Sequence, residues 1–140
     1  MMTNSKRKGS DFERAMVKKL NNKLNGGEFK RIPGSGSIGT NLSIPSLQGD
    51  LLGTIKGIVR KVKVECKVGY GNEKQLTLKK EWLDKISEEA SRDYSIPILI
   101  GRFTGSRNGV EEFVVMDLNV FIELMNLITE LGETIDEFYE

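Results

Sequence analysis

The feature that most constrains the fold is an alternation of charged and apolar residues in the middle of the chain. Four apolar residues alternate there with four charged ones: Val62, Val64, Cys66 and Val68 with Lys61, Lys63, Glu65 and Lys67. Successive side chains of a β-strand point to opposite faces, so this spacing predicts a strand with one face in a core and a charged second face. We place this strand at residues 58–68, as the second strand of a hairpin whose first strand covers residues 48–55.

Other periodic segments complete an α/β pattern. Phe12, Met16, Leu20 and Leu24 recur with helical spacing, which predicts a helix from Ser10 to about Leu24. The nearly continuous apolar run at residues 96–103 predicts a buried strand. The remaining predicted elements are a strand at 28–32, a helix at 77–93, a strand at 111–116, and a last helix at 118–131, capped by Asp117 and ended by Gly132. The order αβββαββα predicts an α/β fold with a mixed β-sheet flanked by helices.

Length and composition exclude several classes of protein. The chain has 140 residues, one cysteine and no histidine, and its length suits one domain at 1–140, with a flexible basic tail at 1–9 and an acidic tail at 133–140. The absence of histidine excludes His-based catalytic triads and His-ligated zinc. The lone Cys66 excludes an internal disulfide and is typical of a reducing compartment. No stretch predicts a secretory signal or a membrane span, so we expect a cytoplasmic protein, prokaryotic or virus-encoded and acting in the host cytoplasm.

The charges are divided unevenly along the chain. Residues 1–80 hold 17 Lys or Arg and 6 Asp or Glu, whereas residues 81–140 hold 4 and 14. This asymmetry predicts a basic face that meets a polyanion such as DNA. Each basic residue taken singly is also typical of a solvated surface, and only the cluster favours DNA. The side chains that we expect to contact DNA phosphates are Lys6, Arg7, Lys8, Lys30, Arg31, Lys61, Lys63, Lys79 and Lys80.

Three residues of the predicted hairpin suggest metal-assisted chemistry. The E-x-K triplet puts the Glu65 carboxylate and the Lys67 ammonium on one face of a strand, and a turn near residues 56–57 places Asp50 beside Glu65. Neighbouring carboxylates repel unless a cation neutralises them, which favours Mg²⁺ or Mn²⁺ bound through oxygen. Such an ion lowers the pKa of a bound water, and a lysine stabilises developing charge, as phosphodiester hydrolysis requires. Taken singly, each residue is also typical of a solvated strand face or strand end.

Glu13 allows two interpretations. Residues 10–13 have the S-x-x-E form of a capping box, in which the glutamate reaches back to a backbone N–H at the start of the helix. At about 100° per residue, however, Glu13 lies at the centre of the apolar stripe, with Leu20 and Leu24 within about 20° of it. A carboxylate buried there costs several kcal/mol unless a cation or strong donors meet it. The second interpretation makes Glu13 a metal-site carboxylate.

Taken together, these segments resemble a known nuclease superfamily. Lys8-Gly9-x-x-Phe12-Glu13-Arg14, Arg31 with the Gly-Ser-Gly-Ser that follows it, Gly49-Asp50 and Glu65-Cys66-Lys67 resemble the PD-(D/E)XK nucleases. Within them, the chain is most similar to the archaeal-type Holliday junction resolvases and their phage-encoded relatives, over about residues 6–103. The resemblance implies a restriction-endonuclease-like core. Two positions depart from the pattern: Gly49 replaces the motif proline, and the glutamine-like position of the next helix has no clear match, with Lys79, Lys80 and Lys85 nearby.

The resemblance also implies roles for individual residues. It assigns the metal site to Glu13, Asp50 and Glu65 with the backbone carbonyl of Cys66, adds Lys67 as a catalytic residue, and implies a loop serine near the scissile phosphate, for which the candidates are Ser35 and Ser37. The expected activity is Mg²⁺-dependent cleavage of branched DNA, with Mn²⁺ as a substitute, in the resolution of four-way junctions during recombination and repair. Two symmetric nicks need two sites, so we expect a homodimer. The apolar last helix serves the core, the interface or both.

Three alternatives remain. The first is a nuclease of the same superfamily that acts on linear duplex or on DNA ends. The second is a non-catalytic DNA-binding module, which is disfavoured because all four residues Glu13, Asp50, Glu65 and Lys67 are present. The third is a plain metal-binding or protein-interaction domain, which leaves the basic half of the chain without a purpose.

Overall fold

The computed structural model describes residues 4–32, 49–69, 71, 73–105 and 108–139. Along the chain its elements are α1 (Asn4–Lys23), β1 (Gly27–Arg31), β2 (Leu51–Ile55), β3 (Val62–Val68), α3 (Lys80–Ser91), β4 (Ile96–Arg102), β5 (Glu112–Val115) and α4 (Leu118–Tyr139). This is the predicted αβββαββα order, and every predicted helix and strand is present.

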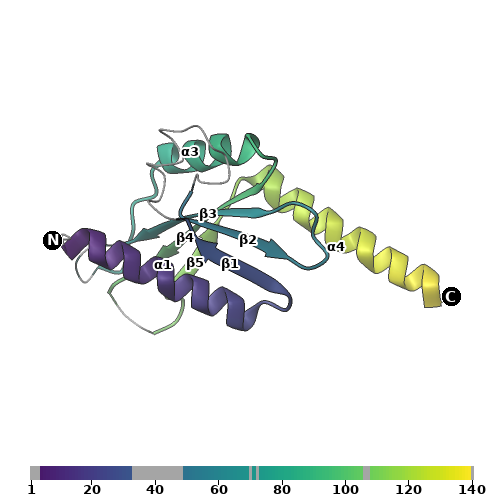
Figure 1. Cartoon of the computed structure of the whole chain (residues 1–140), viewed down its shortest axis with the longest axis horizontal. Coiled ribbons are helices and arrows are strands. Elements are labelled where there is room, and N and C mark those ends of the chain that lie inside the picture. Colours follow the sequence, from purple (N-terminus) through teal and green to yellow (C-terminus); the bar gives the residue numbers. More distant parts are fainter. Residues whose placement is uncertain (1–3, 33–48, 70, 72, 106–107, 140) are drawn as a thin grey trace.

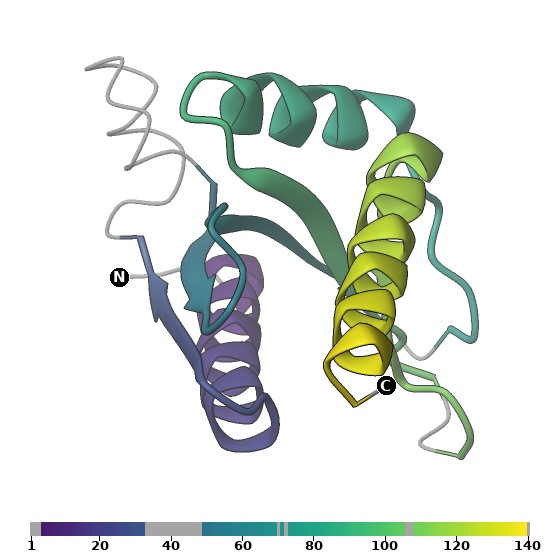
Figure 2. The same cartoon turned by 90° about the vertical axis from the view of Figure 1, so that its right-hand side faces the viewer.

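One mixed sheet organises the molecule, with the strands in the order β1-β2-β3-β4-β5. Neighbouring strands are antiparallel except for the parallel pair β3 and β4. A parallel pair needs a long crossover, which α3 supplies. Helices α1 and α3 lie on opposite faces of the sheet (Figures 1 and 2). The predicted fold class, a mixed sheet flanked by helices, is confirmed.

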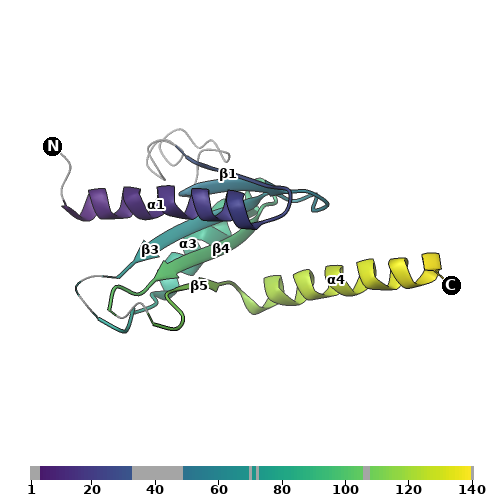
Figure 3. The same cartoon turned by 90° about the horizontal axis from the view of Figure 1, so that it is seen from below.

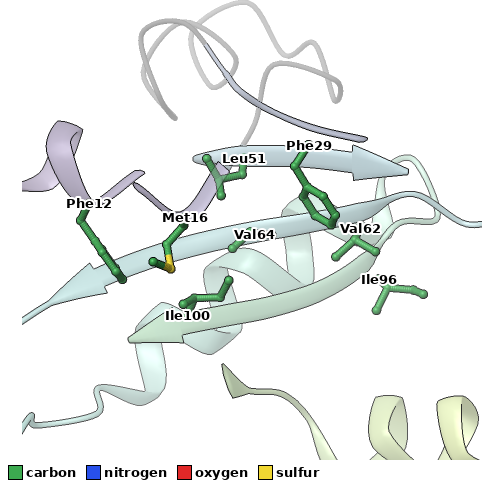
Figure 4. Packing of buried hydrophobic residues seen from close by; sticks show 8 residues of the cluster. All are labelled: Phe12, Met16, Phe29, Leu51, Val62, Val64, Ile96 and Ile100. Carbon is green, nitrogen blue, oxygen red and sulfur yellow. The ribbon is translucent and has the colours of Figure 1, made fainter. Parts of the chain in front are cut away.

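The main hydrophobic core lies between α1 and the sheet. Phe12 and Met16 point from α1 toward the strands, and the apolar side of the β3 alternation faces them as predicted (Figure 4). Full burial of one such side chain contributes roughly 1.5–3 kcal/mol, so this layer is a major source of stability. The strands contribute these buried side chains to the cluster: Phe29, Leu51, Val62, Val64, Ile96 and Ile100.

The second face of the sheet, under α3, carries the charged side of the same alternation. Lys63 is fully buried there, with Nζ 3.0 Å from Asp93 Oδ2 and 3.3 Å from the carbonyl oxygen of Glu89. The expectation that Lys63 contacts DNA is contradicted, because an ammonium enclosed beneath a helix cannot reach a phosphate. The alternation predicted which face Lys63 occupies, but not that α3 covers it.

Helix α1 begins earlier than predicted. Residues 4–9, expected in a flexible tail, form its first turns, so Ser10 lies inside the helix and cannot be its N-cap. The capping-box interpretation of Glu13 is therefore wrong. Lys6, Arg7 and Lys8 are good helix formers, and Lys8 Nζ donates a hydrogen bond of 2.6 Å to the carbonyl oxygen of Gly69. That distant contact holds the first turns against the end of β3.

Helix α4 is longer than predicted. The Asp117 carboxylate accepts a hydrogen bond from the Asn119 N–H at 2.7 Å, as expected of a cap, but the helix passes through Gly132 and takes in residues 133–139 of the expected acidic tail. A glycine inside a helix costs only about 1 kcal/mol, which good helix formers on either side can offset. Every residue from Ile128 to Tyr139 is exposed, and this half of α4 extends beyond the sheet (Figure 3). Among the described residues, no helix is long and apolar enough to cross a membrane.

Candidate active site

Asp50 is placed by the backbone around it. Its N–H donates to the carbonyl oxygen of Val64 at 2.9 Å, and its carbonyl oxygen accepts from the Ile32 N–H at 3.0 Å, which ties it to β3 and to the end of β1. Gly49 before it has a φ of +87°, and a Cβ there would lie 2.9 Å from Lys63 Cγ. Proline fixes φ near −65°. The departure from the motif proline thus fits the backbone that presents Asp50.

The side chain of Asp50 meets the E-x-K triplet. Its Oδ2 accepts a hydrogen bond from the backbone N–H of Cys66 at 2.8 Å. Strands β2 and β3 pair in the antiparallel register expected of the hairpin. The structure therefore brings Asp50 next to the segment that contains Glu65 and Lys67.

Glu65 is the most enclosed carboxylate of this group. It is only 5% exposed, and Lys67 Nζ lies 3.2 Å from its Oε1. Its Oε2 is buried and has no hydrogen-bond partner among the described residues. Burial, followed by the negative charge of Asp50, raises the pKa of Glu65, against the opposing effects of Lys85 and Lys67. Such an oxygen is a ready ligand for a cation.

Glu13 approaches the same region from α1. It is 8% exposed, and its Oε2 accepts a hydrogen bond from Arg31 Nε at 3.0 Å and forms an ion pair with Arg31 Nη2 at 2.8 Å. Burial and then the charge of Asp50 raise the pKa of Glu13 despite that partner. Because Asp50 acts on both Glu13 and Glu65, the three carboxylates share one region of negative potential. Burial and all three of these carboxylates also raise the pKa of the Cys66 thiol.

The three carboxylates do not close around one point. Within the described part of the chain, no three Asp, Glu or Cys side chains converge closely enough to hold a metal ion as they stand. Each carboxylate instead has a protein partner: Arg31 for Glu13, the Cys66 N–H for Asp50, and Lys67 for Glu65. The arrangement is a set of separately held carboxylates around the end of β3.

Helix α3 also contributes residues to this region, and the sequence alone gave these residues no role. Lys85 Nζ lies 3.9 Å from Glu89 Oε1, and its charge lowers the pKa of Glu65. The Lys67 ammonium lies over the ring of Trp82, 4.7 Å from its centroid. Residues 82, 85 and 89 share one face of a helix by their spacing. That spacing is visible in the sequence, but which face of α3 meets β3 is not.

Some of the predicted DNA-contacting residues lie close to this site. Lys8 reaches Gly69, directly after β3. Lys79 Nζ lies 5.7 Å from the centroid of the Trp82 ring, which the Lys67 ammonium also faces. Arg31 is bound to Glu13 and is part of the site itself.

Other predicted contacts lie elsewhere. Lys61 directly precedes β3, about 13 Å along the strand from Glu65 at the usual rise per residue, and lines an open hollow together with Lys30. Lys80 is exposed and pairs with Asp84 at 2.8 Å on α3. Lys6 and Arg7 are exposed on the first turns of α1. Ser35 and Ser37 lie outside the described residues.

Comparison with known protein families assigns the chain to one of them. The family described as "Phage putative PDDEXK endonuclease" matches residues 4–136, which include all the candidate site residues. The chain belongs to this family. No protein with a curated description matches it in sequence.

The fold of this PDDEXK endonuclease is similar to a solved resolvase structure. That structure, at 1.6 Å resolution, is of Hjc from Archaeoglobus fulgidus, a Holliday junction resolvase from an archaeal hyperthermophile. The two share 15% sequence identity with a TM-score of 0.50, over 81% of this chain and 86% of Hjc. At that identity the similarity shows the fold, which is restriction-endonuclease-like, and leaves the substrate of this nuclease to be argued separately.

Proposed function

We propose that this nuclease is a divalent-metal-dependent, structure-selective endonuclease that cleaves branched DNA, with a four-way junction as its substrate. The observation that carries the proposal is the buried Oε2 of Glu65 beside Asp50 and Lys67, which has no hydrogen-bond partner among the described residues. Burial, followed by the negative charge of Asp50, raises the pKa of both Glu13 and Glu65, as expected of carboxylates whose charge is only partly compensated. Carboxylate oxygens are the ligands that Mg²⁺ prefers, with Mn²⁺ as a substitute, so the residues present fit such an ion.

The chain's own residues suit the remaining tasks. Glu13, Asp50, Glu65 and the carbonyl of Cys66 would hold the metal, which supplies an activated water and neutralises charge on the phosphate when bound. Lys67, held by Glu65 and lying over Trp82, would stabilise the charge that develops on the scissile phosphate. Basic residues around the site, among them Lys8 and Lys79, would bind the DNA backbone and fix its position.

Metal binding requires the carboxylates to leave their present partners. Arg31 would release Glu13 as a cation takes over the compensation of its charge. The side chain of Arg31 is one-third exposed, so its guanidinium would turn toward solvent or toward a DNA phosphate. Arg31 would thus bind Glu13 before the metal enters, as it does in this structure, and would contact DNA once the metal has replaced it.

The choice of a branched substrate is supported by the fold shared with Hjc, itself a Holliday junction resolvase. Phosphate contacts carry no sequence information, which suits recognition of DNA shape. A homodimer acting in the host cytoplasm would have two active sites related by symmetry, one for each of the two nicks. The family is described as an endonuclease, and one rival within that activity is cleavage of linear duplex or of DNA ends.

One assay tests the proposal and its rival. The full chain is incubated with a synthetic four-way junction, a flap and a linear duplex of matched sequence, with Mg²⁺ and with a chelator. We expect Mg²⁺-dependent paired nicks in the junction, loss of cleavage in Asp50→Asn and Glu65→Gln, and retained DNA binding in both variants. Equal cleavage of the linear duplex would favour the rival. Normal cleavage by either variant would remove the proposed site.

A further inference from the structure

Helix α4 presents an apolar seam that the described part of the molecule leaves uncovered. Positions separated alternately by three and four residues form this seam over the whole helix: Leu118, Phe121, Met125, Ile128, Gly132, Ile135 and Tyr139. Six of the seven are apolar or aromatic, and all of them are exposed, with Ile128 at 60% and Ile135 at 56%. A sustained repeat of this kind is the pattern by which one helix packs against another.

The seam is distinct from the side of α4 that meets its own domain. Val120 and Leu124 pack against the core. At about 100° per residue these two lie roughly 40–80° to one side of Ile128, whereas Phe121 and Met125 lie 20–60° to the other. The outward stripe is therefore not a loosely packed part of the core. It continues over the C-terminal half of α4, which extends beyond the sheet (Figures 1 and 3).

The charges on α4 limit what can cover the seam. The helix carries five acidic residues and no Lys or Arg, and four of the five lie in its C-terminal half: Glu130, Glu133, Asp136 and Glu137. Negative charge at the C-terminal end of a helix is unfavourable because it adds to the negative end of the helix dipole. A helix packs well against such a seam, and a basic surface beside it would offset this negative charge.

A second copy of this chain has both features. We propose that two copies associate through an antiparallel pair of α4 helices. In that orientation the acidic half of each helix lies beside the first turns of the other, where the domain carries Arg60, bound to Glu123 at 2.5 Å, and the exposed Lys61. A parallel pair would instead set the two acidic ends side by side. This interface would be the one that holds the proposed homodimer together. Only its expected effect on cleavage rests on the proposed function.

The oligomeric state of the full chain tests the association. Sedimentation across micromolar concentrations should give a dimer for the wild type. Ile128→Lys and Ile135→Lys should each weaken it by roughly a hundredfold, because a lysine replaces an interface isoleucine at two symmetric places. Both isoleucines are exposed in the single chain, so these variants should fold normally, which thermal unfolding checks. The control is Asn126→Lys, which makes the same charge change on the opposite face of α4 and should stay dimeric. A monomeric wild type would assign the seam to a different protein and overturn the proposal, as would seam variants that remain dimers.

Charge reversal and cleavage complete the test. Glu133→Lys should weaken an antiparallel dimer by roughly severalfold through lost attraction to the basic domain, whereas a tighter dimer would overturn the antiparallel orientation. The monomeric variants should still nick one strand of a junction while losing paired nicks. Failure of the proposed function would appear separately, as a wild-type dimer that does not cleave branched DNA at all.

Discussion

Arg31 on β1 contacts a single oxygen of Glu13 on α1 twice, through a hydrogen bond from Nε at 3.0 Å and an ion pair with Nη2 at 2.8 Å. The pair joins the first helix to the edge of the sheet beside Asp50. It also stabilises the buried carboxylate of Glu13, since a guanidinium compensates part of its charge. The raised pKa of Glu13 shows that this compensation is incomplete.

Glu13→Gln tests whether this carboxylate serves the metal site. We expect cleavage to fall by orders of magnitude, with more Mg²⁺ needed for half-maximal activity. The metal-free protein should melt no earlier than the wild type, because a poorly compensated buried charge is removed. The measurements are a metal titration of cleavage and thermal unfolding in chelator. Asp11→Asn, an exposed position on the same helix, is the control and should leave cleavage unchanged. An early-melting Glu13→Gln variant that cuts normally would make Glu13 a purely structural residue.

The raised pKa of Glu65 predicts a pH-dependent stability. The folded protein keeps the proton on Glu65 to a higher pH than the unfolded chain does, so this group's stabilising contribution is present at low pH. It is lost as the pH rises from the ordinary value of 4.5 through the raised pKa. In metal-free buffer, Glu65→Gln should therefore gain stability relative to the wild type across that window and then level off. Thermal unfolding at a series of pH values measures this. Glu28→Gln, at an exposed position on β1, should show no such trend. A stability difference between Glu65→Gln and the wild type that does not change with pH would contradict the prediction.

Lys63 should matter to stability and not to DNA binding. Asp93→Ala leaves its buried ammonium without its carboxylate partner and should cost about 3 kcal/mol, whereas the apolar Lys63→Met should be close to neutral or stabilising. Both variants should bind DNA as the wild type does. The matched control is Lys30→Met at an exposed lysine, which should weaken DNA binding with little effect on stability. Chemical denaturation measures stability, and DNA titration measures binding. A loss of DNA affinity in Lys63→Met would indicate that Lys63 contacts DNA after all.

The first turns of α1 should contribute to the salt dependence of DNA binding. Each neutralised phosphate gives a slope of about −0.9 in log K against log salt on duplex DNA. Replacing Lys6, Arg7 and Lys8 by alanine keeps a helix-forming sequence and should make the slope shallower by roughly one to three units. Lys23→Ala, at the far end of α1, is the control. An unchanged slope in the triple variant would exclude these residues from the DNA interface.

The sequence determined the order of elements and the apolar side of the sheet. Both follow from local periodicities, of two residues in β3 and of 3.6 in α1, which need no knowledge of distant segments. The approach of Asp50 to the E-x-K triplet also followed from the sequence, because an antiparallel hairpin fixes which residues of its two strands meet. The central position of Glu13 on the apolar stripe of its helix likewise predicted its burial.

Only the tertiary structure decided which charged side chains are buried and what compensates them. Lys63 and Glu65 share one face of β3, yet α3 encloses Lys63 with Asp93, whereas one oxygen of Glu65 has no hydrogen-bond partner in the described part of the chain. The start of α1 depends on a contact between Lys8 and Gly69, 61 residues apart, and the compensation of Glu13 depends on Arg31 on another element. Helix ends and buried charges are set by small differences between opposing free energies, and the deciding contacts come from residues far apart in the chain.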